Sequence, residues 1–151
     1  MSQVFVYRVV VGPSDIDFLD HASNIAYVRW VQDATVAHSE AVGLNVDTYK
    51  SLGGIFVIRR HEVDYLRSAV LGDELEIHTQ VAAVTAAKAY RATQIYRTSD
   101  NALLARASTV WGYVQTDTGR PARVPQWVRD AFGLQTVAPA VAVAAAQAAC
   151  G

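Results

Sequence analysis

Cysteine is almost absent from this sequence of 151 residues, because Cys150, next to the last residue, is the only one. A single cysteine cannot form an intramolecular disulfide or build a cysteine-based metal cluster. His61 and His78 show no paired spacing that favours a metal either. The sequence therefore implies neither a metal nor another cofactor, and it favours a reducing compartment.

Long apolar runs are also missing, since no uninterrupted stretch reaches the length of about 18 residues that a membrane span needs. Residues 1–7 lack the basic start and the apolar run of a signal peptide. Charge of one sign is scarce, because 13 Lys and Arg stand against 14 Asp and Glu, for a net charge of −1. No run of four basic residues is available to grip a phosphate backbone. We expect a cytoplasmic protein that binds neither membrane nor nucleic acid.

The composition is that of a folded chain. Hydrophobic residues make up 52% and charged residues 18%, which excludes disorder throughout, and the length fits one domain. After Gly133 the composition changes to Ala, Val and Gln. This change predicts one domain over residues 1–133 and a low-complexity tail over residues 134–151, disordered or weakly helical and outside the core.

One segment, from Asn24 to Val42, has a clear helical period. Ser23 or Asn24 can cap its start, and Gly43 is a natural stop. The segment predicts one amphipathic helix, in which the apolar residues and His38 form one stripe at spacings of three and four. They are Tyr27, Trp30, Val31, Ala34, His38 and Ala41.

Most of the remaining sequence resembles strands. Short connections rich in turn residues favour antiparallel neighbours over helical crossovers. A short helix is predicted from Pro125 through Phe132, and residues 45–50 form a polar stretch. The fold class is therefore α+β, with a five-stranded antiparallel sheet wrapped around one long helix. The predicted strands are Phe5–Val11, Ile55–Leu66, Glu74–Val84, Ala87–Arg97 and Leu103–Gln115.

A loop dense in acids precedes the long helix. A helix start offers unpaired N–H groups and a positive dipole end, which stabilise negative charge developing on a carbonyl oxygen. An adjacent carboxylate could then attack that carbonyl or activate water. Caps and dipole complements are the alternative interpretation of the same acids. The polar residues concerned are Asp15, Asp17, Asp20, His21 and Asn24.

The pattern Asp-x-Asp-x-x-(Gly)-His-x-x-Asn-x-x-Tyr-x-x-Trp resembles that of the hotdog-fold acyl-CoA thioesterases of the 4-hydroxybenzoyl-CoA thioesterase type. The resemblance covers roughly residues 3–133 and implies the hotdog fold and hydrolysis of an acyl thioester. It extends through Val63 to Ala69, Leu71 to Leu75 and Asp117 to Pro121. The pattern itself falls on Asp15, Asp17, His21, Asn24, Tyr27 and Trp30.

The resemblance implies that Asp17 is the catalytic carboxylate, as nucleophile or as general base toward water. It places Asn24 and the backbone N–H groups near residues 23–26 around the thioester oxygen. His21 would orient the substrate or Asp17, with a hydrogen bond to the backbone as the alternative. Glu62, on a strand, is a rival carboxylate.

Two positions depart from the family pattern. Asp20 stands where a glycine usually precedes the histidine, and Ser23 replaces the first of two paired asparagines. Glycine would permit a positive φ at the first position, which Asp tolerates less well. The departures bear on the geometry of the loop and of the oxyanion pocket.

The phosphates of CoA need cations near the mouth of an apolar groove. Lys88 lies where the family often has a basic residue, and Arg59, Arg60 and Arg91 are weaker candidates. Tyr27 completes the expected substrate-binding residues. The acyl group and the choice between CoA and a carrier-protein thioester stay open.

The assembly implied is a homodimer or homotetramer with the site at a subunit boundary, because one helix leaves strand edges and apolar surface uncovered. Two other functions are compatible with the fold. A hydratase would normally have Asp and His five residues apart with Asn-Pro between them, whereas Asp17 and His21 are four apart. A non-catalytic acyl or lipid carrier would use Asp17 only as a cap.

Overall fold

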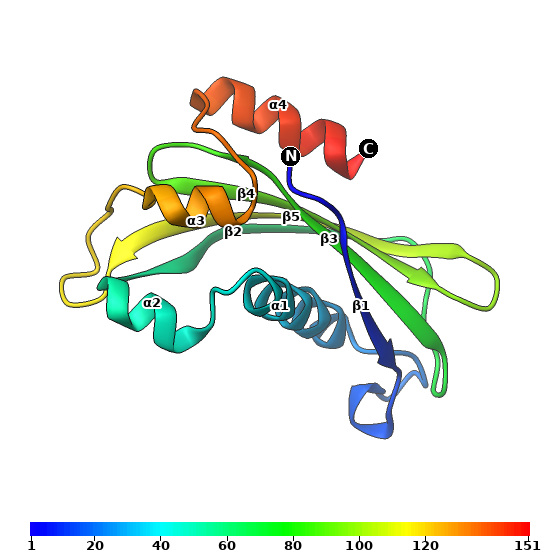
Figure 1. The fold of residues 1–151 in the computed structure, drawn as a ribbon. Helices are drawn as coiled ribbons and strands as arrows, with labels where there is room; N and C mark the ends of the chain where they lie inside the picture. Colours follow the sequence, from blue (N-terminus) through cyan, green and yellow to red (C-terminus); the bar gives the residue numbers. More distant parts are fainter.

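The structure, a computed structural model, describes all 151 residues and contains one five-stranded sheet (Figure 1). Every pair of neighbouring strands is antiparallel, and the order is β1-β3-β4-β5-β2. The five predicted strands are confirmed to within a residue at each end. Their bounds are β1 Phe5–Val10, β2 Gly54–Tyr65, β3 Glu74–Val84, β4 Lys88–Arg97 and β5 Ala102–Gln115.

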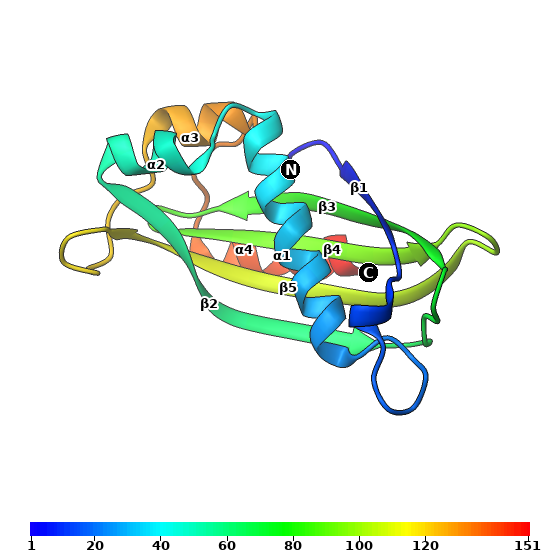
Figure 2. The same ribbon diagram turned by 90° about the horizontal axis from the view of Figure 1, so that it is seen from below.

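The long helix α1, Asn24–Ala41, crosses the inner face of this sheet (Figure 2). Ser23 is its N-cap, because the Ser23 side chain accepts a hydrogen bond from the Ile25 N–H at 3.0 Å. The stripe predicted from the helical period is buried from Tyr27 to His38, and it packs on buried side chains of β3 and β5. Its last member, Ala41 at the end of the helix, is exposed. The α+β hotdog fold, with a sheet wrapped around one helix, is confirmed.

Three shorter helical segments accompany α1, in addition to the C-terminal helix described below. A single 3-10 turn, η1 (Pro13–Asp15), follows β1, and α3 (Gln126–Ala131) falls within the helix predicted after Pro125. Helix α2 (Val46–Leu52) occupies the stretch interpreted as merely polar. Its Asn45 cap accepts from the Thr48 N–H at 2.9 Å, but Tyr49 is its only buried residue, too little for an apolar period to show.

The prediction of a disordered tail outside the core is wrong. Residues Pro139–Cys150 form helix α4, which lies on the face of the sheet opposite α1 (Figure 1). Ala142 and Ala146 are buried there against Tyr90 of β4. Alanine has the highest helix propensity, and its small side chain lets the helix backbone approach the sheet closely. The low-complexity composition is therefore that of a packed helix.

Strands β1 and β2 are the two edges of the sheet, since each pairs with one neighbour only. β2 is the longer of the two and leaves one row of backbone donors and acceptors unpaired. None of the helices combines the length and the hydropathy needed to cross a membrane.

Candidate active site

The acidic loop folds back on itself just before α1. The Asp17 N–H donates to the His21 carbonyl oxygen at 2.9 Å, and the Asp20 N–H donates to the Asp17 carbonyl oxygen at 3.1 Å. Ile16 and Ala22 pair across the base of the loop. The tip is apolar and open, because Phe18 is 92% exposed. The loop is thus a closed turn that presents hydrophobic side chains to solvent.

Asp20 occupies the position where the family usually has glycine, and its φ is +61°. The left-handed conformation that a glycine would permit is therefore kept with an aspartate in place. Asp and Asn are the side chains that enter this region most readily, because they hydrogen-bond locally. The departure from the family pattern at this position is therefore compatible with a positive φ.

The Asp17 carboxylate is half-buried and only partly engaged. One oxygen, Oδ1, accepts from the Leu19 N–H at 2.9 Å, which fixes the side chain in an Asx turn. The other oxygen, Oδ2, accepts no hydrogen bond, and no ion pair of the structure includes Asp17. A held carboxylate with one free oxygen is suited to attack or to accept a proton.

Most of the N–H groups at the start of α1 already have acceptors. The Ser23 N–H donates to the Asp15 carbonyl oxygen, the Ile25 N–H to Ser23 Oγ, and the Ala26 N–H to the Ser23 carbonyl oxygen. The Asn24 N–H has no acceptor in the chain. The group of four donors expected from the sequence thus narrows to one free N–H, at Asn24.

A hollow of about 240 Å³ joins these groups. Four predicted site residues line it: Asp17, His21, Asn24 and Tyr27. The His21 ring is exposed and makes no hydrogen bond to the backbone, the alternative considered for it. The sequence spacing therefore brings together the residues predicted for the catalytic group.

Tyr27 holds the wall of the hollow in place. Its Oη accepts from the Ala69 N–H at 2.9 Å and donates to the Arg67 carbonyl oxygen at 3.3 Å. Burial raises the pKa of Tyr27, so the phenol stays protonated at neutral pH. On the other side, Tyr65 Oη donates to the Asn24 carbonyl oxygen at 3.1 Å. These three hydrogen bonds join the end of β2 and the segment after it to the first turn of α1.

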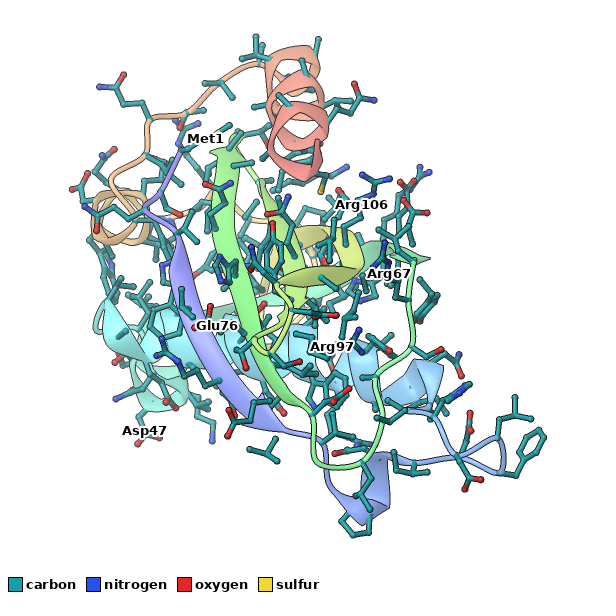
Figure 3. The ribbon with its side chains drawn as sticks, turned by 90° about the vertical axis from the view of Figure 1, so that its right-hand side faces the viewer. Met1, Asp47, Arg67, Glu76, Arg97 and Arg106 are labelled. Carbon is teal, nitrogen blue, oxygen red and sulfur yellow. The ribbon has the colours of Figure 1, made fainter.

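The sequence analysis gave no role to the last residue of β2 or to the segment that follows it, yet these residues complete the hollow. Tyr65, Leu66, Arg67 and Ser68 all line it. Arg67, labelled in Figure 3, is exposed and takes part in no ion pair. The segment belongs to the family resemblance, but only the contacts of Tyr27 and Tyr65 in the folded chain reveal that it lies against the helix start.

Lys88 and Arg59 lie elsewhere. Together they line a hollow of about 450 Å³ on the outer face of the sheet, beside Gln147 of α4. Arg59 lies across β5 at Gly112, where an added Cβ would come within 2.9 Å of Arg59 Nε. The structure therefore brings these two cations to each other and not to the hollow of Asp17.

Two other candidates are also distant from Asp17. Glu62, the rival carboxylate, is exposed on the outer face and forms an ion pair with Arg60. Arg91 is buried beneath α1 and is not a surface cation. No group of three or more His, Cys, Asp or Glu side chains is placed to share a metal.

Residues 11–132 match the family model of the thioesterase-like superfamily. The chain belongs to this superfamily. The match includes the acidic loop, α1 and all strands except β1. The family predicted from the motif around Asp17 is confirmed.

Individual relatives are more distant. A Xenopus laevis protein named THEM6 is 36% identical over 75 residues, which are 50% of this chain and 36% of that protein. This chain thus spans about a third of that relative. A 1,4-dihydroxy-2-naphthoyl-CoA thioesterase from Synechocystis has a TM-score of 0.80 at 20% identity, covering 86% of this chain and 96% of its own. A Staphylococcus aureus hypothetical protein in complex with CoA has a TM-score of 0.77 at 15% identity, covering 99% and 87%.

Proposed function

We propose that this protein hydrolyses an acyl thioester of CoA, or of an acyl carrier, in the hollow at the start of α1. The observation that carries the proposal is that Asp17, with its Oδ2 free, and Asn24, with its N–H free, line the same hollow of about 240 Å³. Superfamily membership and the fold shared with a 1,4-dihydroxy-2-naphthoyl-CoA thioesterase support this reaction class.

Asp17 can act in two ways that give the same overall reaction. As a nucleophile, Oδ2 attacks the thioester carbonyl, the thiolate leaves, and water hydrolyses the resulting acyl-aspartyl anhydride. As a general base, it takes a proton from water, the hydroxide attacks, and the proton passes to the leaving thiolate. One water is consumed in each case, and a free acid and a thiol are released.

Negative charge develops on the thioester oxygen in both routes. The Asn24 N–H, at the positive end of the α1 dipole, is the donor proposed to stabilise it. His21 is proposed to orient the substrate from the same loop, and Tyr27 holds the wall through Ala69 and Arg67. The side chains thus divide into one reacting group, one oxyanion donor and positioning residues.

Recognition of CoA is proposed to use cations. Arg67 lines the hollow itself and is the nearest candidate for a phosphate. The structural neighbour in complex with CoA supports this type of ligand. Lys88 and Arg59 remain proposed phosphate contacts, but only for a thioester bound to a second copy of the chain.

A homodimer or homotetramer is proposed because apolar surface and one strand edge are left uncovered. Exposed hydrophobic side chains lie at the end of β2, on the loop before α1 and in the first turn of α1, and the β2 edge is open. A second copy would cover both features. Sedimentation should give a mass of at least twice 16.4 kDa at micromolar concentration, and a stable monomer would contradict the assembly. The exposed residues are Phe18, Leu19, Ile25, Tyr65 and Leu66.

Thiol release from a panel of aryl-, short- and long-chain CoA thioesters tests the function. We expect turnover of at least one class, with free CoA and acid formed in equal amounts. The panel also identifies the acyl group, since the aromatic and aliphatic rim suits an aryl and a medium chain equally. Tight binding of a thioester without turnover of any class would contradict the proposal and indicate an acyl carrier.

A further inference from the structure

A second cavity, of about 150 Å³, lies at the other end of α1 from the hollow of Asp17. The second half of α1, helices α2 and α3 and the inner face of the sheet enclose it, and 11 of its 15 lining residues are hydrophobic. Four aromatic rings line it, from α2, β2, β5 and the C-cap of α3: Tyr49, Phe56, Trp111 and Phe132. A cavity of this volume accommodates a ligand of about the size of benzene.

One charged group lines this apolar cavity without an opposite charge. Arg91 of β4 is 3% exposed and belongs to no ion pair. Its Nη1 donates to His38 Nδ1 at 2.9 Å and to Thr79 Oγ1 at 3.0 Å. A guanidinium has five N–H donors. Nε and Nη2 make no hydrogen bond in the structure, so three donors have no partner.

The neighbours of Arg91 do not neutralise it. Burial, with help from Arg91, lowers the pKa of His38 to about 4, so His38 is neutral at pH 7. Burial also raises the pKa of Tyr49. The ring of Phe132, whose centroid is 5.8 Å from Arg91 Cζ, contributes a cation–π contact only. Glu40 lines the cavity, but it is exposed and does not pair with Arg91.

Arg91 keeps its charge in this setting, because burial lowers its pKa only to about 10. A buried charge without a counter-charge is costly, and a fork of free donors matches the two oxygens of a carboxylate. A second donor nearby is also unused, since the enclosed indole Nε1 of Trp111 has no hydrogen-bond partner. The cavity therefore combines one unpaired positive charge and free N–H donors with hydrocarbon walls.

We propose that this cavity binds a small carboxylic acid with an apolar body, an aryl or short alkyl carboxylate, whose carboxylate pairs with Arg91. The apolar walls favour such a ligand over an inorganic anion, which leaves them unfilled. The charge of Arg91 favours it over a neutral ligand of the same shape. The site is separate from the hollow of Asp17, and the proposal does not depend on thioester hydrolysis.

Binding of 4-fluorobenzoate, followed by fluorine NMR, tests the site directly. We expect 4-fluorobenzoate to bind at least about tenfold more tightly than 4-fluorobenzamide, which has the same shape without the charge. Inorganic phosphate should not displace it. In Arg91→Met the acid and the amide should bind equally, while circular dichroism confirms that the variant is folded.

Variants at the cavity mouth keep the test decisive should Arg91→Met fail to fold. Val36 lines the cavity and is 50% exposed, so Val36→Glu places a carboxylate at the mouth without disturbing the core. We expect it to weaken binding of 4-fluorobenzoate about tenfold, and Glu40→Gln to strengthen it severalfold. Gln32→Glu, on an exposed position of α1 outside the cavity, is the matched control and should leave binding unchanged.

The acid could instead bind as a reaction product in the hollow of Asp17. Asp17→Asn distinguishes the two sites, and we expect it to bind 4-fluorobenzoate as the unmodified protein does. Loss or gain of binding in Asp17→Asn, with no effect of Val36→Glu, would overturn the proposal. Equal binding of the acid and the amide to the unmodified protein would overturn it as well.

Discussion

The Asp17 N–H donates to the carbonyl oxygen of His21 at 2.9 Å. This bond closes the acidic loop, so the position of the proposed catalytic carboxylate depends on the backbone of His21, four residues further along the chain. Asp20 lies within the closed turn with a φ of +61°. The left-handed conformation of Asp20, which has no proposed chemical role, therefore helps to hold the Asp17 carboxylate in position.

Substitutions at Asp20 should report this strain. Asp20→Ala keeps a Cβ in the left-handed conformation but removes the side chain that can hydrogen-bond locally, whereas Asp20→Gly removes the Cβ as well. The alanine variant should therefore have a free energy of unfolding about 1 kcal/mol lower than the glycine variant. In an ordinary helical or extended position the order would be reversed. Urea unfolding of the two variants measures the difference, and an alanine variant more stable than the glycine variant would refute the strained turn.

Stability should depend on the ionisation of His38. Its pKa is about 4 in the folded protein and about 6.5 when unfolded, so the unfolded chain binds the extra proton between these values. The free energy of unfolding should therefore fall by about 3 kcal/mol as the pH drops from 6.5 to 4. His38→Gln keeps an acceptor for Arg91 and removes the titration, so its pH profile should be flatter over this window. Parallel profiles for the two proteins would contradict the assignment.

Helix α4 should contribute to stability through its buried face. Ala142 is fully buried against the sheet, so Ala142→Asp should lower the free energy of unfolding by about 2 to 4 kcal/mol. Ala144→Asp makes the same change on the exposed face of the same helix and should cost less than about 1 kcal/mol. Equal losses in the two variants, measured by thermal unfolding, would mean that the helix does not pack on the sheet.

Removal of a proposed phosphate contact should raise KM for the thioester. Arg67→Ala should raise KM for a CoA thioester about tenfold with little change in kcat, because the cation binds a part of the substrate that does not react. The effect should shrink at high salt, as expected for an exposed charge. Lys88→Ala should also raise KM if a second copy completes the site. An effect on kcat alone, for either variant, would argue against phosphate binding.

The sequence predicted the elements that carry a long periodic pattern. The stripe from Tyr27 to His38 extends over several turns of α1, and the alternation in β3 extends from Glu74 to Val81, so both elements were located to within a residue. Helix α2 has seven residues and one buried side chain, which is too short for a period. Helix α4 was predicted as a tail outside the core because its alanines pack through their small size. An alanine-rich helix of this kind has the same composition as a low-complexity segment, so composition alone does not distinguish the two.

The candidate site was predictable where it is local in sequence. Asp17, His21, Asn24 and Tyr27 lie within one turn and the helix after it, so spacing alone brings them together. Arg67 comes 40 residues after Tyr27, and only the hydrogen bond between them reveals its place. Arg91 is a basic residue on a strand, and which face of the sheet it occupies follows from strand pairing. Sites formed by segments that are distant in sequence could therefore be identified only from the folded structure.

The central claim is that the Asp17 carboxylate carries thioester hydrolysis, and kcat of Asp17→Asn measured against Asp20→Asn tests it most directly. Both variants remove one carboxylate from the same loop, and Asn tolerates the positive φ at residue 20. We predict that Asp17→Asn lowers kcat at least about a hundredfold with KM nearly unchanged, whereas Asp20→Asn stays within about threefold of the unmodified protein. Near-normal turnover by Asp17→Asn, together with loss of turnover in Glu62→Gln, would contradict the account.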